Sequence, residues 1–303
     1  MAHVGIVGSG NVGANTAFFI AEKGVADVQL YDIQEGLSTG KALDMMEAAP
    51  IRGYKTKISG TDRRDILLKS EIIIITAGAV RQPGQNREDL YDANRGIVEE
   101  LADSMKGTAA KIIMVTEPVD LLTALFVKRS GVKRRQVMGL GGMLDSTRLR
   151  YLIAHELGLS FENVSALVVG RHSSAMIPLP EYCSVSGIPI SRLLPQQSIE
   201  RLFDQTRRAG DLIVTMAQRA SAYYGPSAAA ADLAEAIHLD TGRVVPVSVV
   251  LQGEYGVNGV AMNLPVVIGR NGIEQVLQPR LTPEQKSQFV NSANDLATIL
   301  ARS

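Results

Sequence analysis

The sequence predicts an α/β fold, with a doubly wound parallel sheet in the first half and a mixed α+β arrangement in the second. The first half alternates short apolar runs with segments of helical spacing. The second half contains two long β-rich runs on either side of a turn, which predict antiparallel strands. With 303 residues, of which 46% are hydrophobic, the chain is long enough for one large domain or two closely packed ones.

Five apolar runs in the first half predict strands, at residues 4–8, 25–33, 71–77, 111–116 and 136–141. They are rich in β-branched residues and bounded by glycine or polar residues, as expected for strands buried on both faces of a parallel sheet. The intervening segments 11–24 and 94–107 have helical spacing and end in glycine, which favours a helix C-terminus. This alternation predicts βαβ units and a domain boundary close to residue 141.

In the second half, helices are expected from Leu144 through the segment 148–158, and over residues 197–224, 227–238 and 282–301. Thr282, Pro283 and Gln285 form a capping-box start with proline at the first helical position. The runs VSALVVGRH and CSVSGIPI carry further β-rich sequence. The runs 244–253 and 259–269 flank the turn-like EYGVNG and predict an antiparallel pair.

Charge balance and cysteine count exclude several classes of function. The chain has 31 basic and 31 acidic residues, so its charge provides no basis for binding nucleic acid or a membrane surface. Cys183 is its single cysteine, which excludes an intrachain disulfide and a cysteine-based metal cluster, and no metal site is predicted. The chain starts with a strand pattern, and no apolar run has the length of a membrane-spanning helix. We therefore expect a cytoplasmic protein.

The segment GSGNVG follows the first predicted strand and opens the first predicted helix. Gly8 allows a tight turn, Gly10 lets the backbone approach a pyrophosphate, and Gly13 permits close helix–strand packing. Asp32 ends the second strand, at the spacing expected for a carboxylate that binds an adenosine ribose and repels the extra phosphate of NADP. The pattern favours an NAD site over a plain glycine-rich turn. Its predicted cofactor-binding residues are Gly8, Ser9, Gly10, Asn11, Val12, Gly13 and Asp32.

A second group of residues indicates proton transfer. His172 follows an apolar run and precedes a polar turn, which places it at a strand end facing a cleft. Upstream, Asp145 and Arg148 are three residues apart, on one face of a predicted helix. An aspartate that accepts the ring N–H of a neutral histidine fixes its tautomer and raises its basicity. Such a histidine can take a hydroxyl proton as hydride leaves for a nicotinamide, although a single histidine at a strand end is more often structural or solvated.

Taken together, these motifs resemble the malate/lactate dehydrogenase family, and most of all its lactate-dehydrogenase-like malate dehydrogenases. The matching stretches are GSGNVG, YDI, ITAGAVRQPGQNREDLYDAN, LDSTR, GRH, MIPL and GEYGVN, in this order across almost the whole chain. The resemblance implies an NAD-binding Rossmann domain at residues 1–141 and a catalytic and substrate-binding domain at 142–303. It also implies reversible hydride transfer between NAD and a 2-hydroxy acid, in a homo-oligomer that is a dimer or a tetramer.

In that family, the loop that corresponds to GAVRQPGQNRED closes over the substrate. On its own, the pattern allows Arg81 and Arg87 to be solvated charges, whereas the resemblance gives Arg87 the role of polarising the reacting carbonyl. The resemblance also implies that Arg81 binds the second carboxylate of a dicarboxylate substrate. A guanidinium binds such a group through two parallel hydrogen bonds. Arg148 would hold the carboxylate common to all substrates of the family, and Asn94 would contact the cofactor. The expected reaction is malate oxidation, as in the tricarboxylic acid cycle.

Two places depart from the family pattern. Glu117 stands where the family usually has an asparagine that donates a hydrogen bond to the substrate, and an ionised carboxylate donates none and repels an anionic substrate. Backbone contacts from Val115 and Glu117 to the nicotinamide need no particular side chain. Arg171 replaces a glycine or another small or acidic residue before the histidine, and Ser173 and Ser174 replace Gly-Asp or Gly-Pro after it.

Because of these departures, three functions stay open at this point: a malate dehydrogenase, a dehydrogenase of another 2-hydroxy acid, and a catalytically weakened NAD-binding paralogue. One hypothesis is that Glu117 and Arg171 form a compensating ion pair or a gate, and the equal alternative is that Arg171 points to solvent. A double-mutant cycle on the two residues distinguishes these alternatives. Glu117→Asn is expected to raise turnover with oxaloacetate, and a drop in turnover would show that Glu117 takes part in the mechanism.

Overall fold

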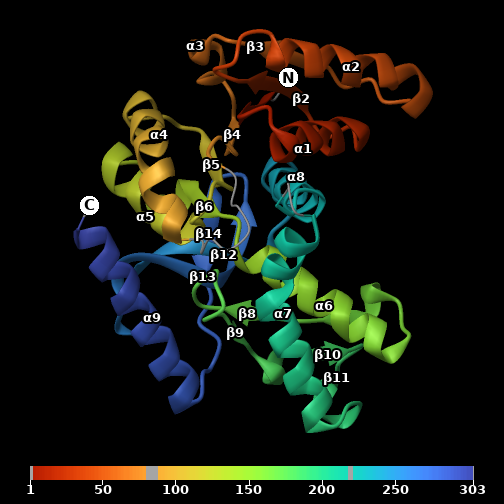
Figure 1. Cartoon of the computed structure of the whole chain (residues 1–303), viewed down its shortest axis with the longest axis vertical. Coiled ribbons are helices and arrows are strands. Elements are labelled where there is room, and N and C mark those ends of the chain that lie inside the picture. Colours follow the sequence, from red (N-terminus) through yellow and green to blue (C-terminus); the bar gives the residue numbers. More distant parts are fainter. Residues whose placement is uncertain (1–2, 80–87, 218–220, 303) are drawn as a thin grey trace.

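The computed structural model describes residues 3–79, 88–217 and 221–302, so the predictions for Arg81 and Arg87 lie outside the described residues. A nine-stranded sheet forms the centre of the molecule, in the order β14-β13-β12-β6-β5-β4-β1-β2-β3, with helices on both of its faces (Figure 1). Its strands are β1 (His3–Val7), β2 (Asp27–Tyr31), β3 (Ile58–Thr61), β4 (Ile72–Ile75), β5 (Lys111–Met114), β6 (Val137–Gly139), β12 (Arg243–Gln252), β13 (Asn258–Gly269) and β14 (Gly272–Val276). The parallel part of this sheet is the doubly wound arrangement expected from the sequence.

Helices connect and cover the strands. They are α1 (Asn11–Glu22), α2 (Leu37–Arg52), α3 (Arg64–Leu67), α4 (Tyr91–Ser104), α5 (Val119–Ser130), α6 (Gly142–Leu157), α7 (Gln196–Ala217), α8 (Tyr224–His238) and α9 (Pro283–Ala301). Strands β1 to β6 pair in parallel, and the four isoleucines of β4 are all buried because helices lie on both sides of them. This burial explains why these strands are continuous apolar runs rather than alternating ones.

The predicted elements of the first half are present with shifted ends. The helix expected at 11–24 ends at Glu22, and the one expected at 94–107 spans Tyr91–Ser104. In both cases a glycine with positive φ follows the helix, Gly24 at +69° and Gly107 at +73°. These glycines therefore end the turns after the helices rather than the helices themselves.

The second half extends the same sheet and also forms a small three-stranded and a small two-stranded sheet. Strands β12 and β13 form the predicted antiparallel pair, and Ser248 of β12 pairs with Gly139 of β6. The run VSALVVGRH is divided between β7 (Val164–Ser165) and β8 (Val168–Val169). The remaining short strands are β9 (Ile177–Pro178), β10 (Ser184–Val185) and β11 (Ile188–Pro189).

The prediction of one long helix over residues 197–224 is wrong at its C-terminal end. Helix α7 ends at Ala217, the described residues 221–223 are not helical, and α8 begins at Tyr224 instead of Ser227. Pro226 is compatible with this earlier start because N–H groups in the first turn have no partner within the helix. The prediction for α9 holds: the Thr282 and Gln285 side chains form a reciprocal capping box.

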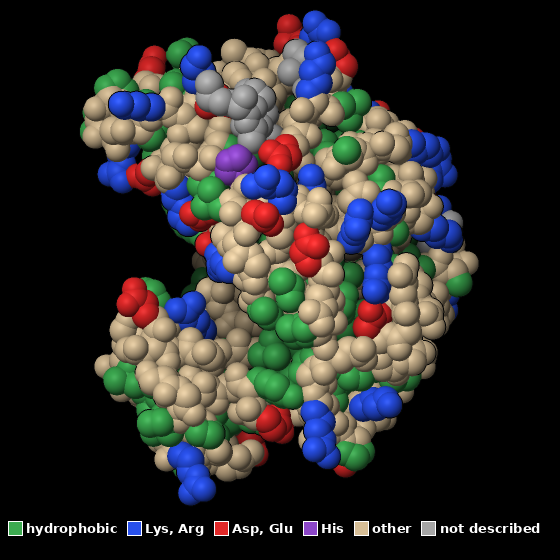
Figure 2. Space-filling view, turned by 180° about the vertical axis from the view of Figure 1, so that it is seen from behind, with side chains coloured by type: hydrophobic (Ala, Val, Ile, Leu, Met, Phe, Trp, Pro, Cys, Tyr) green, Lys and Arg blue, Asp and Glu red, His purple; other side chains and the backbone are tan. Residues whose placement is uncertain are grey.

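The strand order reverses between β1 and β4, which are neighbours in the sheet although β2 and β3 separate them in the chain. In open α/β sheets, ligands bind outside the carboxyl ends of the strands at such a switch point. The segments that follow β1, β4 and β5 meet at this point. Figure 2 shows the molecule from behind, where its surface is deeply hollowed between its upper and lower parts.

Candidate active site

A groove of about 540 Å³ runs along the carboxyl ends of β1, β2 and β4. It is lined by the glycine-rich turn after β1, by Tyr31 and Asp32 at the end of β2, and by residues 76–78 after β4. Residues 221–223, just before α8, complete its wall. The groove therefore lies at the switch point of the sheet, where the sequence predicted a dinucleotide.

The backbone of the turn fits a pyrophosphate. Gly8 has a φ of +96°, and a Cβ added at Gly13 would lie 1.9 Å from the carbonyl oxygen of Gly8, so neither position accepts another residue without distortion. Around Gly10, by contrast, the described residues leave open the space that a side chain would fill. Gly10 is the N-cap of α1, and the first-turn residues 11–13 of that helix line the groove. The N–H groups at a helix N-terminus have no partner within the helix and can donate hydrogen bonds to an anion.

The Asp32 carboxylate is held in place by the backbone. The Ser9 N–H donates to Asp32 Oδ2 at 2.6 Å, and the Gln34 N–H donates to Oδ1 at 3.0 Å. A carboxylate has further lone pairs that can accept hydrogen bonds from ribose hydroxyls. A phosphate on the ribose would instead meet a fixed negative charge, so the groove fits NAD better than NADP.

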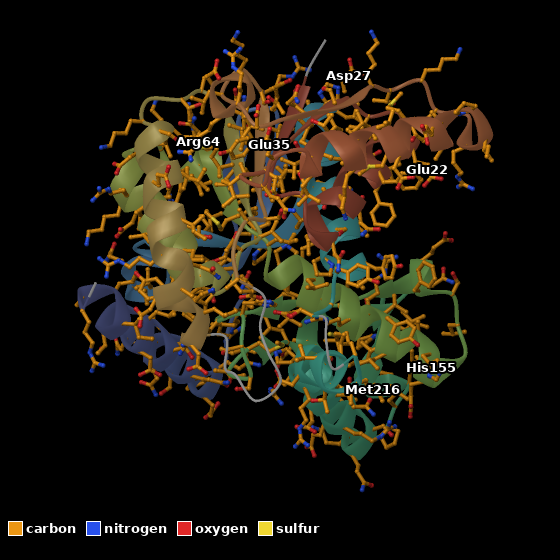
Figure 3. The ribbon with its side chains drawn as sticks, turned by 45° about the horizontal axis from the view of Figure 1, so that its top comes forward. Glu22, Asp27, Glu35, Arg64, His155 and Met216 are labelled. Carbon is orange, nitrogen blue, oxygen red and sulfur yellow. The ribbon has the colours of Figure 1, made fainter. Side chains whose placement is uncertain are left out.

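Sequence reasoning missed Arg64, which also lines the groove. Its guanidinium carbon lies 5.9 Å from the ring centre of Tyr31, and its Nη2 is 2.7 Å from Glu100 Oε1. Figure 3 places Arg64 on the part of the molecule built around β2 and β3, and His155 and Met216 on the opposite part. Arg64 lies in a polar segment with no motif, so no local signal identified it.

A smaller cavity of about 150 Å³ adjoins the groove and shares lining residues with it, among them Val12 and Gly78. Part of the predicted site lines this cavity. The lining residues among the predicted site are Val12, Val115, Glu117, Arg148 and His172. A molecule in this cavity therefore lies next to whatever occupies the inner end of the groove.

His172 and Asp145 form a buried pair, as the sequence predicted. His172 Nδ1 is 2.6 Å from Asp145 Oδ2, and the two residues are 4% and 1% exposed. Arg148 Nη1 lies 3.4 Å from the other carboxylate oxygen, Asp145 Oδ1, one turn along α6. A carboxylate on Nδ1 leaves Nε2, which faces the cavity, as the atom that can exchange a proton.

Asn263 links the two segments that carry this pair, and sequence reasoning did not find it. Its Oδ1 accepts from the Gly142 N–H at 2.5 Å, and its Nδ2 donates to the Gly170 carbonyl oxygen at 2.9 Å. One buried amide thus joins the start of α6 to the segment that carries His172. The available signal was an asparagine within the apolar run GVAMNLPVVIG of a buried strand.

Glu117 contacts the opposite side of the histidine ring. Its Oε1 lies 3.2 Å from His172 Nε2, and its Oε2 accepts from the Val119 N–H in the first turn of α5 at 3.1 Å. The imidazole of His172 therefore lies between two carboxylates. The hypothesis of an ion pair between Glu117 and Arg171 stays untested.

The amide of Asn94 is engaged by the backbone. Its Oδ1 accepts from the Ala79 N–H, and its Nδ2 donates to the Glu117 carbonyl oxygen, both at 2.7 Å. Asn94 thereby ties the segment after β4 to the turn after β5, and a contact with the cofactor stays a prediction.

As for metals, no three His, Cys, Asp or Glu side chains come together as ligands within residues 3–79, 88–217 and 221–302.

A second buried carboxylate supports the histidine backbone and was not predicted. Asp120 Oδ2 accepts from the His172 N–H at 2.7 Å, and Oδ1 accepts from Ser248 Oγ at 2.6 Å. Burial raises the pKa of Asp120 to about 6. In the folded protein this group therefore keeps its proton to higher pH than in the unfolded chain, where its pKa is 3.8.

We expect Asp120→Asn to remove part of the pH dependence of folding. The stabilisation that comes from the raised pKa is fully present below the unfolded value and is lost as pH rises through about 6. Relative to the native chain, the variant should gain about 2 kcal/mol in free energy of unfolding between about pH 4.5 and 7.5. Urea unfolding of both proteins at these two pH values measures it. A difference between the two proteins that does not change with pH would contradict the assignment.

Comparison with known proteins identifies the chain. Residues 2–139 match the model of the lactate/malate dehydrogenase NAD binding domain, and residues 142–302 match that of the lactate/malate dehydrogenase alpha/beta C-terminal domain. The chain belongs to the lactate/malate dehydrogenase family. It is therefore an NAD-dependent dehydrogenase with the fold expected from its sequence.

The similarity to its relatives extends over almost the whole chain. Malate dehydrogenase of Chlorobium phaeobacteroides is 42% identical over 98% of this chain and 99% of its own, and that of Heliobacterium modesticaldum is 40% identical over 98% and 97%. The crystal structure of Cryptosporidium parvum malate dehydrogenase matches with a TM-score of 0.96 at 35% identity, covering 100% and 99% of the two chains. Lactate dehydrogenase of the same organism, complexed with lactic acid and nicotinamide adenine dinucleotide, matches with a TM-score of 0.95 at 34% identity, covering 100% and 98%.

Proposed function

We propose that this dehydrogenase interconverts malate and oxaloacetate with NAD and NADH. The observation that carries the proposal is the His172–Asp145 pair, whose second ring nitrogen, Nε2, faces a cavity that adjoins the dinucleotide groove. The curated relatives named malate dehydrogenase support this choice of substrate. Arg81 supports it too, because a guanidinium at this loop position matches the second carboxylate of a four-carbon diacid.

The side chains of the cavity have separate roles in this proposal. In oxaloacetate reduction, protonated His172 gives the Nε2 proton to the ketone oxygen, and in malate oxidation it takes the hydroxyl proton back. Asp145 holds the ring through Nδ1 and stabilises the positive charge of the imidazolium. Arg148 binds the carboxylate next to the reacting carbon, and Arg87 polarises the carbonyl and stabilises the charge that develops on its oxygen.

The groove holds the cofactor in the same proposal. The first-turn N–H groups of α1 bind the pyrophosphate, and Asp32 binds the ribose hydroxyls. NAD supplies the acceptor for the hydride that leaves the 2-carbon of malate. The backbone of residues 115–117 lines the smaller cavity, which adjoins the groove, and this position suits it to contact the nicotinamide end. The remaining residues that we assign to cofactor binding are Gly8, Ser9, Gly10, Asn11, Val12, Gly13 and Asn94.

Finer features remain predictions. We propose the domain division at residues 141 and 142, a homotetrameric or homodimeric assembly, a cytoplasmic location and a role in the tricarboxylic acid cycle. Light scattering on the purified chain measures the assembly. Of the helices that the structure describes, none is long and apolar enough to cross a membrane.

Arg81→Gln tests the choice of substrate. Glutamine cannot bind a carboxylate through two charge-assisted hydrogen bonds, so kcat/KM for oxaloacetate should fall by about 10²-fold or more while that for pyruvate does not fall. NADH absorbance is followed with oxaloacetate, pyruvate and a bulkier 2-oxo acid, for the native chain and the variant. A native preference for pyruvate or for the bulkier acid would favour the alternative, a dehydrogenase of another 2-hydroxy acid. Binding of NADH without turnover of any of the three would favour a catalytically weakened paralogue.

A further inference from the structure

The atom through which His172 must exchange its proton is in contact with another side chain. Under the proposed function, Nε2 faces the reacting oxygen of the substrate. In the structure, Glu117 Oε1 lies 3.2 Å from this atom, within the cavity that the substrate would enter. Glu117 therefore occupies the place of an oxygen that exchanges a proton with the histidine.

The surroundings of Glu117 favour its ionised form. Its second oxygen accepts from the Val119 N–H at the start of α5, where the helix dipole and the unpartnered N–H groups stabilise a negative charge. The side chain is also 29% exposed, so burial does not force it to take up a proton. A carboxylate accepts hydrogen bonds and donates none, so a bond between Glu117 and His172 places the proton on Nε2.

On the other side of the ring, Asp145 Oδ2 lies 2.6 Å from Nδ1. A histidine with an ionised carboxylate on each ring nitrogen donates from both, which only the imidazolium can do. We propose that Glu117 is an internal substitute for the substrate oxygen, which holds His172 as an imidazolium in the substrate-free enzyme and gives up Nε2 when substrate binds. Glu117 is thus a positioning residue that sets the protonation state of His172, and this role rests on the proposed function.

Other charged groups surround the ring and stay the same when Glu117 is changed. Asp145 and Arg148 face it from α6, Asp120 contacts its backbone from α5, and Arg171 precedes it in the chain. The residues of α7 that line the cavity, Gly210 and Val214, carry no charge. Burial raises the pKa of Asp120 to about 6, so Asp120 titrates in the same pH range as histidine.

This role has opposite consequences for the two directions of reaction. Reduction of a 2-oxo acid needs the imidazolium, so Glu117 extends it to higher pH. Oxidation of a 2-hydroxy acid needs the neutral imidazole, so Glu117 moves this reaction to more alkaline pH. The equilibrium between substrates and products is unaffected, because a residue of the enzyme changes rates in both directions consistently.

The direct test follows the imidazole itself and needs no catalysis. The full-length protein is labelled with ¹⁵N at its four histidines, and the signal absent from His172→Gln identifies His172. In Glu117→Gln, the pH midpoint of this signal should fall by about one unit or more, because one of two nearby negative charges is lost. Glu162→Gln, which removes an exposed carboxylate outside the cavity, should leave the midpoint unchanged. A midpoint within about 0.3 units of the native value in Glu117→Gln would overturn the inference.

The second test is the pH profile of kcat/KM, which reports the substrate-free enzyme. In Glu117→Gln, the alkaline fall in oxaloacetate reduction and the rise in malate oxidation should both move to lower pH by about one unit. Glu117→Asn, which carries the residue expected at this position from the resemblance, serves as the second variant and should shift in the same direction. Profiles that change in height without moving along the pH axis count against the inference. Absence of any turnover in the native chain, together with a shifted NMR midpoint, would instead refute the proposed function alone.

Discussion

His172→Gln is expected to lower kcat for oxaloacetate reduction by about 10²–10⁴-fold, because it removes the group that exchanges the proton accompanying hydride transfer. Glutamine is polar and of similar reach, but it cannot take up or release a proton near neutral pH. NADH should bind with unchanged affinity, since the groove is formed by other residues. Stopped-flow absorbance measures the turnover, and NADH fluorescence measures the binding.

The matched control for this experiment is His155→Gln. His155 lies in α6, like Asp145, but it is exposed and packs beside the ring of Tyr151, with 5.9 Å between the ring centres. Its replacement should leave kcat unchanged. If loss of His172 leaves oxaloacetate reduction at the native rate, proton transfer does not pass through this ring and the proposed function is wrong.

Asp145→Asn is expected to have an effect of similar size, on the order of 10³–10⁴-fold in kcat, although the side chain keeps its shape. The asparagine amide no longer stabilises an imidazolium, and it can force the wrong tautomer on a ring only 2.6 Å away. Arg148 also loses the carboxylate that lies 3.4 Å from its guanidinium, so KM for oxaloacetate should change as well.

The double variant separates these effects. If Asp145 acts through His172, then Asp145→Asn should cost little further kcat once His172 has been replaced by glutamine, because groups that act as a unit are not additive. The change in KM should persist in the double variant, because it arises from Arg148. Additive losses in kcat would show that Asp145 acts independently of the histidine.

The sequence showed that Glu117 is unusual at its position, but it did not show which groups Glu117 contacts. In the sequence, Glu117 replaces an amide donor by a negative charge. The sequence therefore suggested a compensating cation, and Arg171, next to His172, was the candidate. The structure brings Glu117 to His172 and to the first turn of α5. Its charge therefore acts on the protonation of the histidine, whether or not Arg171 also contributes.

Local sequence was sufficient for the parallel strands other than β3, which was not predicted, and for the glycine-rich turn with Asp32, the spacing of Asp145 and Arg148, and the Thr282 cap. Each depends on residues close together in the chain, where backbone geometry and side-chain periodicity act directly. The single-helix prediction for 197–224 failed because helical spacing continues past Ala217, whereas the end of a helix depends on packing with distant residues.

Only the tertiary structure decided which charges meet around His172. Asp145 belongs to α6, whereas Glu117 and Asp120 belong to the segment after β5, and the pairing of strands at the centre of the sheet brings both segments to one histidine. Asn263, more than ninety residues after Gly170, joins the start of α6 to the segment that carries the histidine. Such contacts leave no periodic or local pattern, because the energy of a buried charge or amide depends on neighbours that the fold alone supplies.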